Sequence, residues 1–219
     1  MKPWRRILSI ENIDTTKDKA TNKVKQLVQD RKPQDVHIFT DGSDIPNMGK
    51  GAAAIIMPTG TTVSRHITKT TPSTNFESEL VGLKLAIELY SRREKQEIIG
   101  EIHIFCDNQG ALRKVANPTI PSTGQHLYLQ ISSELLSLSQ LTTINLTWCP
   151  GHNGIEGNKR ADTEAKKAAS NPLTQRQTLP TSRAKIKQRI IEENKPERFT
   201  PEEYKRLRGK CCQKNLTKH

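Results

Sequence analysis

Two apolar runs of the chain end in an aspartate, and these aspartates are the first residues whose pattern suggests chemistry. Residues 36–40 lead into Asp41, and residues 102–106 lead into Asp107. One aspartate after a strand is ordinarily a turn residue. If the two runs form neighbouring parallel strands, however, their carboxylates lie side by side and repel each other unless a cation holds them. Because magnesium prefers carboxylate oxygens, the pair predicts a cation site at one edge of a sheet.

A third acid, Glu79, belongs to an amphipathic helix that is predicted to begin at Thr74. Thr74 and Glu77 have the spacing of a capping box, which explains Glu77 as an acid of the first turn. Leu83 follows Glu79 by one turn, so Glu79 shares the face that should pack on the sheet. A carboxylate on a buried face costs free energy unless a partner or a metal holds it. This position therefore favours a functional role for Glu79.

A fourth acid, Asp162, lies in the last predicted helix, one turn after Asn158. Its place on the helix does not decide its role. Asp162 is equally explained as a solvent-facing charge among nearby cations, which are Lys159, Arg160 and Lys166. Periodicity alone cannot separate these two interpretations.

The segment that carries these acids alternates strand and helix signals with short turns. The predicted strands are residues 36–41, 51–57, 61–67, 101–107 and 142–148. The predicted helices are residues 74–92, 109–115, 124–139 and 158–169. The second and third strands should form an antiparallel hairpin around the turn at 58–60. The order predicts an α/β fold with a mixed five-stranded sheet flanked by helices.

Three regions are expected along the chain. Residues 1–34 form a linker or N-terminal extension, with one amphipathic helix near 18–29. Residues 35–170 form the globular domain. Residues 171–219 form a basic tail, partly helical around 182–194 or disordered, in which Pro196 and Pro201 interrupt the pattern.

Charge and composition narrow the class of partner. The net charge is +12, and residues 171–219 hold 13 Lys/Arg against 5 Asp/Glu. Such an excess suits a polyanion, although a ribosomal or membrane-surface protein would show it too. No run of about 18 apolar residues predicts a membrane helix, and no secretory signal is recognised. We therefore expect an intracellular protein, cytoplasmic or nuclear, that is not secreted and has no membrane partner. The four cysteines have no framework spacing, and Cys211, Cys212 and His219 match no zinc motif.

Four motifs in order resemble the type 1 ribonuclease H domain. They are TDGS (40–43), NFESEL (75–80), FCDNQ (105–109) and WCPGHNGIEGNKRAD (148–162). The resemblance covers about residues 35–170, and the predicted order of elements is also that of the family. The last motif is most similar to domains attached to reverse transcriptases of non-LTR retrotransposons.

The resemblance implies an endoribonuclease that hydrolyses the RNA strand of RNA–DNA hybrids, leaving a 3′-hydroxyl and a 5′-phosphate. It implies two bound divalent cations, normally Mg2+ with Mn2+ as an alternative, held by Asp41, Glu79, Asp107 and Asp162. Asp41 would be the shared ligand. His152, in a loop with flanking glycines, would assist proton transfer and product departure. The implied substrate contacts are Gly42, Ser43, Asn75, Gln109 and Asn158. The implied partners are the hybrid and an attached reverse transcriptase in a retroelement polyprotein.

The sequence also departs from the family and leaves alternatives open. Phe76 stands where a second asparagine is common, and no Lys/Trp-rich insertion precedes residue 124. A basic protrusion that grips the hybrid is therefore missing or reduced, and the tail or an attached polymerase could replace it. A non-catalytic binding module would not need all four acids, whereas a DNA-acting nuclease or transferase of this fold would use similar ones. The sequence does not distinguish a stand-alone protein from a polyprotein fragment or a decayed copy. It leaves open the oligomeric state, the preferred metal and the cut-site preference.

Overall fold

The computed structural model describes residues 8–67, 74–92, 100–118, 123–171 and 176–177. All of them belong to one compact unit, Met1–Ser182. The expected tail helix at 182–194, the two prolines of the tail, Cys211, Cys212 and His219 lie outside the described residues. So does most of the predicted tail.

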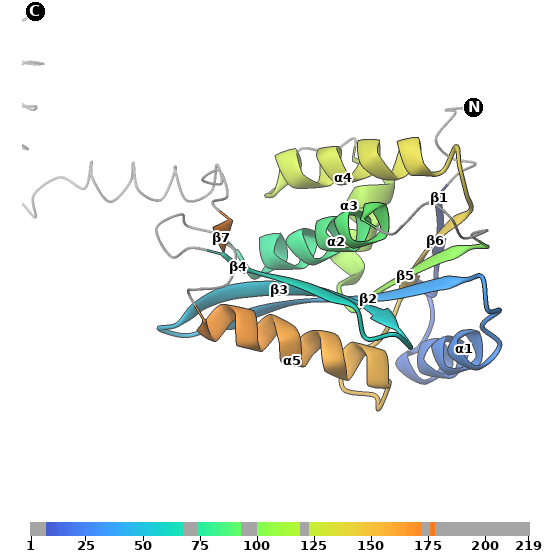
Figure 1. Ribbon diagram of the computed structural model, residues 1–219, viewed down its shortest axis with the longest axis horizontal. Coiled ribbons are helices and arrows are strands. Elements are labelled where there is room, and N and C mark those ends of the chain that lie inside the picture. Colours follow the sequence, from blue (N-terminus) through green and yellow to red (C-terminus); the bar gives the residue numbers. More distant parts are fainter. Residues whose placement is uncertain (1–7, 68–73, 93–99, 119–122, 172–175, 178–219) are drawn as a thin grey trace, which may run out of the picture. The chain divides into compact units, whose positions relative to one another are not determined.

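The described strands form one mixed sheet with the order β1-β6-β5-β2-β3-β4-β7 (Figure 1). Their bounds are β1 Leu8–Glu11, β2 Val36–Ile45, β3 Gly49–Met57, β4 Thr62–Ile67, β5 Ile102–Cys106, β6 Ile144–Trp148 and β7 Arg176–Gln177. Strands β2 to β6 are the five predicted from sequence. Strands β2, β3 and β4 pair antiparallel, including the expected hairpin, while β2, β5 and β6 pair parallel. The mixed sheet flanked by helices is confirmed, and it gains a short parallel strand at each edge, β1 beside β6 and β7 beside β4.

Strand β2 is longer than predicted. It continues four residues beyond Asp41 to Ile45, and Gly42 pairs with Ala52 of β3. The expectation that Asp41 ends its strand is therefore wrong. What ends after Thr40 is the pairing with the parallel neighbour β5. The antiparallel partner β3 continues to supply hydrogen bonds, so β2 does not need to turn there.

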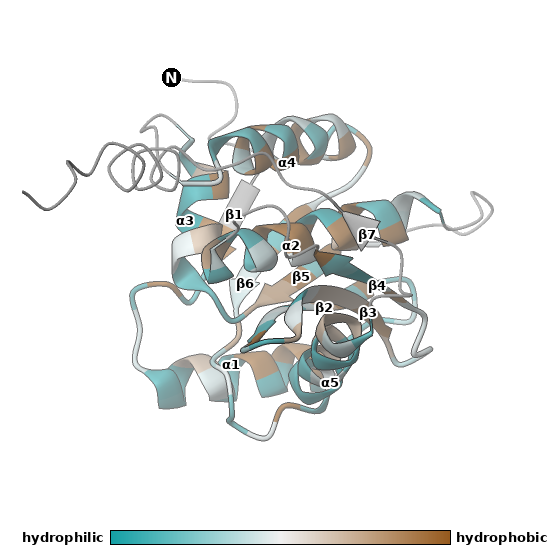
Figure 2. Cartoon of the chain, turned by 90° about the vertical axis from the view of Figure 1, so that its left-hand side faces the viewer, coloured by the Kyte–Doolittle hydropathy of each residue, from teal (hydrophilic) through white to brown (hydrophobic). Residues whose placement is uncertain are grey.

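Five helices cover the two faces of the sheet (Figure 1). They are α1 Lys17–Gln29, α2 Asn75–Ser91, α3 Gln109–Ala116, α4 Gln125–Leu138 and α5 Glu156–Ser170. Helices α2, α3 and α4 lie on one face, and α1 and α5 lie on the other (Figures 1 and 2). The helix expected near 18–29 is confirmed as α1. No helix among the described residues has the length and apolar character needed to span a lipid bilayer.

A hydrophobic core lies on each side of the sheet. The larger one packs β-strand residues such as Ile38 against α2, α3 and α4. The smaller one contains Phe39 and Phe105, whose rings stack with centroids 4.4 Å apart, together with Val24 of α1 and Ala161 of α5. Alternate residues of β2 therefore serve opposite cores, as the period of a strand requires. Figure 2 shows these strands in hydrophobic colours between helices whose outer sides are hydrophilic.

Candidate active site

Strand register places Asp41 and Asp107 next to each other. Phe39 pairs with Phe105 and Thr40 with Cys106 in the parallel ladder of β2 and β5. The next position on each strand is one of the two aspartates. The Thr40 hydroxyl donates to the Phe105 carbonyl at 3.2 Å, which fixes the two strands together just before the acids. The predicted pairing of parallel neighbours is confirmed.

Helix α2 brings Glu79 to the same place. The predicted capping box is present, since the Thr74 hydroxyl accepts from the Glu77 amide at 3.2 Å and the Glu77 carboxylate accepts from the Thr74 amide at 2.7 Å. Two residues further on, the backbone of Glu79 lies against Gly42 of β2. A Cβ atom at Gly42 would lie 2.5 Å from the Glu79 nitrogen, so only glycine permits this approach. The Gly42 backbone also hydrogen-bonds the Glu79 carboxylate.

Glu79 is buried and has one unsatisfied oxygen. The residue is 6% exposed, and its Oε2 atom has no hydrogen-bond partner among the described residues. Ligand atoms of Glu79, Cys106 and Asp107 all lie within 4.8 Å of one another. A buried carboxylate oxygen without a donor is costly. A cation at this point would satisfy it.

Helix α5 contributes Asp162 from the other side of the sheet. Ala161 and Ala165 are fully buried, which presents Asp162 at the rim of the packed face. Its Oδ2 atom accepts a hydrogen bond from Lys166 Nζ at 2.7 Å, one turn later. This pair alone would also fit a solvent-facing charge on the helix. Asp162 belongs to the site because its charge acts on both Asp41 and Asp107.

A cavity of about 360 Å3 opens over these carboxylates. Its lining includes five of the residues singled out from sequence, which are Asp41, Asp107, His152, Asn158 and Asp162. Asn158 is buried, and its side-chain Oδ1 has no partner among the described residues. The cavity thus combines three carboxylates with a polar group that a ligand could satisfy, and Glu79 adjoins Asp41 and Asp107.

Burial and mutual repulsion make the charged carboxylates unfavourable. Burial, then the charges of Asp107 and Asp162, raise the pKa of Asp41 to about 8, while Lys166 opposes this. Burial, then Asp107 and Asp41, hold the pKa of Glu79 well above its ordinary value. Burial and Asp162 raise the pKa of Asp107, against a lowering by His152. Several buried carboxylates whose negative charges repel one another in this way are typical of a site that binds a cation.

The donor set fits a hard divalent cation. Four carboxylates offer oxygen ligands, as Mg2+ requires. The fifth candidate, Cys106, is completely buried, and this burial raises the pKa of its thiol well above the ordinary value. A protonated thiol is a poor ligand for a hard ion. The carboxylates are therefore the residues that would hold the metal.

The loop before α5 carries His152 over the cavity. His152 is exposed and has a φ of 61°, and Gly154 has a φ of 72°. Between them, Asn153 donates from Nδ2 to the Thr21 hydroxyl of α1 at 2.8 Å. The N-terminal helix thus holds one residue of the His152 loop.

Five of the ten residues predicted for the site are not part of the cavity lining. Glu79 is one of them, although it interacts with Asp41 and Asp107. The other four are Gly42, Ser43, Asn75 and Gln109. Gly42 is behind Glu79, as described above. Asn75 is exposed at the first turn of α2, where its carbonyl accepts from the Ser78 hydroxyl at 2.6 Å. Gln109 begins α3, two residues after Asp107.

Two residues of the site were not among the ten predicted for it. Lys166, named from sequence only as a cation near Asp162, pairs with that acid from four residues along the helix. Trp148 donates from its indole Nε1 to the Asp107 carbonyl at 2.9 Å. Nothing local in the sequence links Trp148 to Asp107, because the contact arises from the pairing of β5 with β6.

Comparison with known proteins identifies the family of the domain. The family model described as RNase H matches residues 33–170. The crystal structure of RNase H1 from the halophilic archaeon Halobacterium salinarum NRC-1 is similar over 61% of this chain and 96% of that chain, with 19% sequence identity and a TM-score of 0.45. The segment matched by the family model contains all four carboxylates and His152. Strand β1 and helix α1 precede it.

Proposed function

The chain belongs to the ribonuclease H family, and we propose that it hydrolyses the RNA strand of RNA–DNA hybrids at a two-cation centre held by Asp41, Glu79, Asp107 and Asp162. The observation that supports this is the convergence of four acids from β2, α2, the end of β5 and α5: three of them line one cavity, and Glu79 interacts with two of these three. The four carboxylates repel one another, which costs free energy. A non-catalytic binding module would gain nothing from such a cluster.

Each part of the site has a distinct task in this proposal. Asp41 interacts electrostatically with Asp107, Asp162 and Glu79, which is compatible with the role of shared ligand that the family resemblance implies for it. Glu79 and Asp107 would complete one side of the centre and Asp162 the other. Bound divalent cations of this kind lower the pKa of the attacking water and stabilise the leaving oxygen. Mg2+ is the ion we propose, with Mn2+ as a substitute.

The remaining residues would handle the proton and the substrate. His152 is exposed and lines the cavity, where its imidazole could donate or accept a proton during the reaction. Asn158, with its unsatisfied Oδ1, would accept a hydrogen bond from the substrate or from bound water. Gly42, Ser43, Asn75 and Gln109 stay proposed contacts of the hybrid. Selectivity for RNA would come from contacts to 2′-hydroxyl groups, which DNA lacks.

A cleavage assay tests the reaction. Labelled RNA–DNA hybrid, duplex DNA and single-stranded RNA are each incubated with the full chain, with and without Mg2+. We expect cleavage of the RNA strand of the hybrid alone, only with the metal, and products that end in a 5′-phosphate. Cleavage of duplex DNA instead would support a DNA-acting enzyme of the same fold.

Asp41→Asn tests the assignment of the centre. The substitution keeps the size of the side chain but removes the negative charge of the ligand proposed to be shared by the two cations. We therefore expect cleavage to fall at least ~10³-fold, while hybrid binding survives. Asp18→Asn is the matched control, because Asp18 is exposed in the first turn of α1. Wild-type cleavage by Asp41→Asn would refute the assignment.

We further propose that this enzyme acts beside a reverse transcriptase in a retroelement polyprotein. The similarity of the motif at 148–162 to non-LTR retrotransposon domains supports this context. Sequencing transcripts that contain this coding segment tests it. A polymerase frame joined to the segment is expected, and transcripts that lack one would contradict the proposal.

A further inference from the structure

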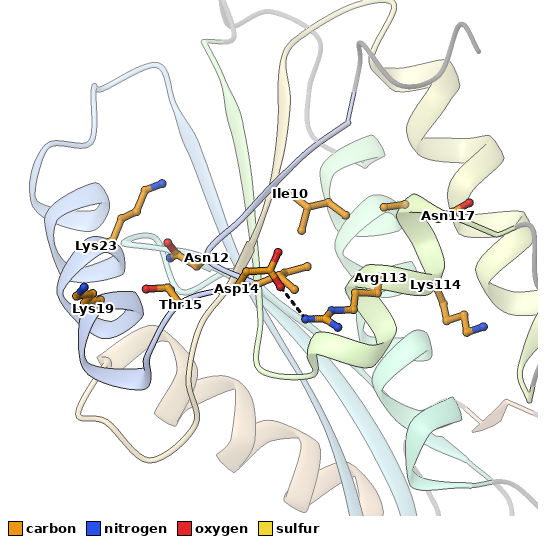
Figure 3. A pocket seen from close by; sticks show the side chains of 11 residues that line it. Ile10, Asn12, Asp14, Thr15, Lys19, Lys23, Arg113, Lys114 and Asn117 are labelled. Carbon is orange, nitrogen blue, oxygen red and sulfur yellow. Dashed lines mark hydrogen bonds and ion pairs between the residues drawn. The ribbon is translucent and has the colours of Figure 1, made fainter. Parts of the chain in front are cut away.

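A second hollow, of about 890 Å3, lies where the N-terminal extension meets α3. Four cations line it: Lys19 and Lys23 of α1, and Arg113 and Lys114 of α3. Figure 3 shows the two lysines of α1 on one side and Arg113 with Lys114 on the other, with the loop residues Asn12 and Asp14 between them. Asp14 is the one carboxylate in the lining. We call this hollow the extension groove.

The extension groove depends on residues that precede the segment matched by the family model. That segment begins at residue 33, after β1 and α1. Strand β1 joins the sheet beside β6, with Ile10 opposite Leu146, and this pairing holds the extension against the domain. The groove is therefore built in part from residues outside the matched segment.

Two hydrogen-bonded links connect the groove with the carboxylate site. Asn12 donates from Nδ2 to the Trp148 carbonyl at 3.5 Å, and the Trp148 indole donates to the Asp107 carbonyl at 2.9 Å. On the other side, Thr21 of α1 accepts from Asn153, a neighbour of His152. Helix α3 itself begins two residues after Asp107. Arg113 lies four residues after the start of α3, about 6 Å along the helix at ~1.5 Å per residue, so the cations of α3 are within reach of a nucleic-acid strand that leaves the cavity.

Two cations of the groove, Arg113 and Lys23, have exposed side chains that an anion can approach. Arg113 is paired with Asp14 at 3.0 Å, but the two side chains are 56% and 93% exposed. Lys23 is paired with Glu11 at 3.0 Å, with the lysine side chain 50% exposed. The Arg113–Asp14 pair is exposed on both sides and contributes little to stability, so a phosphate can replace the Asp14 carboxylate at small cost. The apolar side chains of Ile10, Ile13 and Ala116 in the lining would contact the sugars between phosphates.

From these observations we propose that the extension groove binds the sugar–phosphate backbone of the RNA–DNA hybrid beyond the point of cleavage. This proposal rests on the proposed function, because it takes the hybrid as the substrate of the neighbouring site. Its recognition is by charge and is therefore independent of base sequence. The groove would also replace the contacts with the hybrid that the missing or reduced basic insertion would otherwise make.

The test compares two double variants that each remove one lysine and one arginine. Lys19→Gln with Arg113→Gln removes cations of the groove. Lys84→Gln with Arg92→Gln is the matched control on α2, where Lys84 contacts Gln130 and Arg92 lies 3.8 Å from Glu88. The readouts are KM for hybrid cleavage and the salt dependence of hybrid binding, measured by fluorescence anisotropy in the Asp41→Asn background. Thermal unfolding verifies that all variants fold.

For the groove variant we expect KM to rise about tenfold, and the slope of log affinity against log salt to fall by about 0.9 for each lost phosphate contact. The control should match the wild type in both. A hybrid too short to leave the cavity should not respond to the groove variant, whereas a long hybrid should.

The outcomes separate the two proposals. If the chain cleaves hybrid but the groove variant matches the control in KM and salt slope, the groove proposal is overturned and the proposed function stands. If the groove variant weakens hybrid binding in a chain that never cleaves hybrid, the groove is supported and the proposed function fails. A groove that instead serves an acidic protein would leave hybrid binding unchanged, which also overturns the proposal.

Discussion

At Asp41, burial and two neighbouring carboxylates act together on one side chain, and their effect should appear in stability as well as in catalysis. The pKa of Asp41 is raised to about 8 in the folded chain without metal. Between its ordinary value and 8, the folded state keeps a proton that the unfolded state has released. By linkage, the free energy of unfolding then falls as pH rises. Glu79 and Asp107 have raised pKa values and contribute with the same sign.

We therefore predict that the metal-free chain becomes less stable between pH 6.5 and 8, by up to ~1.4 kcal/mol per pH unit for each group that titrates there. The window begins at 6.5 because His37 acts in the opposite direction below it: burial and His103 lower the pKa of His37 from 6.5 to about 4. Urea unfolding at a series of pH values, in a chelator, measures the slope. Adding Mg2+ should restore stability most at the upper end, since only the charged carboxylates bind it.

Asp41→Asn provides the control for this prediction. The amide has no charge to lose, so the pH slope of the metal-free variant should be shallower and its response to Mg2+ smaller. If the stability of the metal-free wild type instead rises between pH 6.5 and 8, the pKa values of these carboxylates are not raised in the folded state as described.

Single residues also mark the limit of what sequence could predict about the site. Asp41 and Asp107 could be found because two strands of similar sequence lead into them, and parallel pairing brings such positions together. Asp162 could not be decided by periodicity, because a helix position at the rim of a packed face looks the same whether it borders solvent or a cavity. The role of Lys166 depends on that same distinction.

At the scale of elements, the distance between β3 and α5 determines where Asp162 lies. Gly51 of β3 permits the contact, since a Cβ atom there would lie 2.2 Å from the Ala165 carbonyl oxygen. We predict that Gly51→Ala pushes α5 away from the sheet, costs about 1–3 kcal/mol of stability, and reduces cleavage even below the unfolding temperature. Denaturant unfolding and hybrid cleavage measure the two effects.

Gly110→Ala is the matched control for that change. Gly110 is exposed in α3, and the nearest atom to its Cβ position would be Asn108 Oδ1 at 3.2 Å, a side-chain atom. Asn108 Oδ1 caps α3 by accepting from the Ala111 amide and must shift slightly, but alanine is the better helix former, so this variant should lose far less stability than Gly51→Ala. If Gly51→Ala is equally harmless, the close approach of α5 does not hold the site.

The elements were predictable where a periodic pattern reports the buried face, and less so where pairing alone creates them. Strands β3 to β6 and helices α1 to α5 follow from apolar spacing, capping and turns. Strand β1 has four residues and β7 two, and each exists because an edge strand offers free hydrogen-bonding groups. The extension of β2 past Asp41 likewise depends on its partner β3, across a run of polar residues that resembles a turn.

For the whole molecule, the distribution of charge predicts a second source of affinity besides the extension groove. Residues 183–219 contain 12 Lys/Arg and 5 Asp/Glu. Truncation after Ser182 removes them and retains β7, which pairs with β4. We predict that the truncated chain folds, cleaves hybrid at saturating substrate, and binds hybrid more weakly with a lower salt slope, because fewer phosphates are neutralised.

Combining the truncation with Lys19→Gln and Arg113→Gln shows whether tail and groove bind the hybrid independently. Separate contacts should give losses in binding free energy that add to within about 0.5 kcal/mol. A smaller combined loss would mean that both compete for the same phosphates. If truncation alone leaves affinity and salt slope unchanged, the tail does not bind the hybrid, and the groove must carry the grip that the missing insertion would otherwise provide.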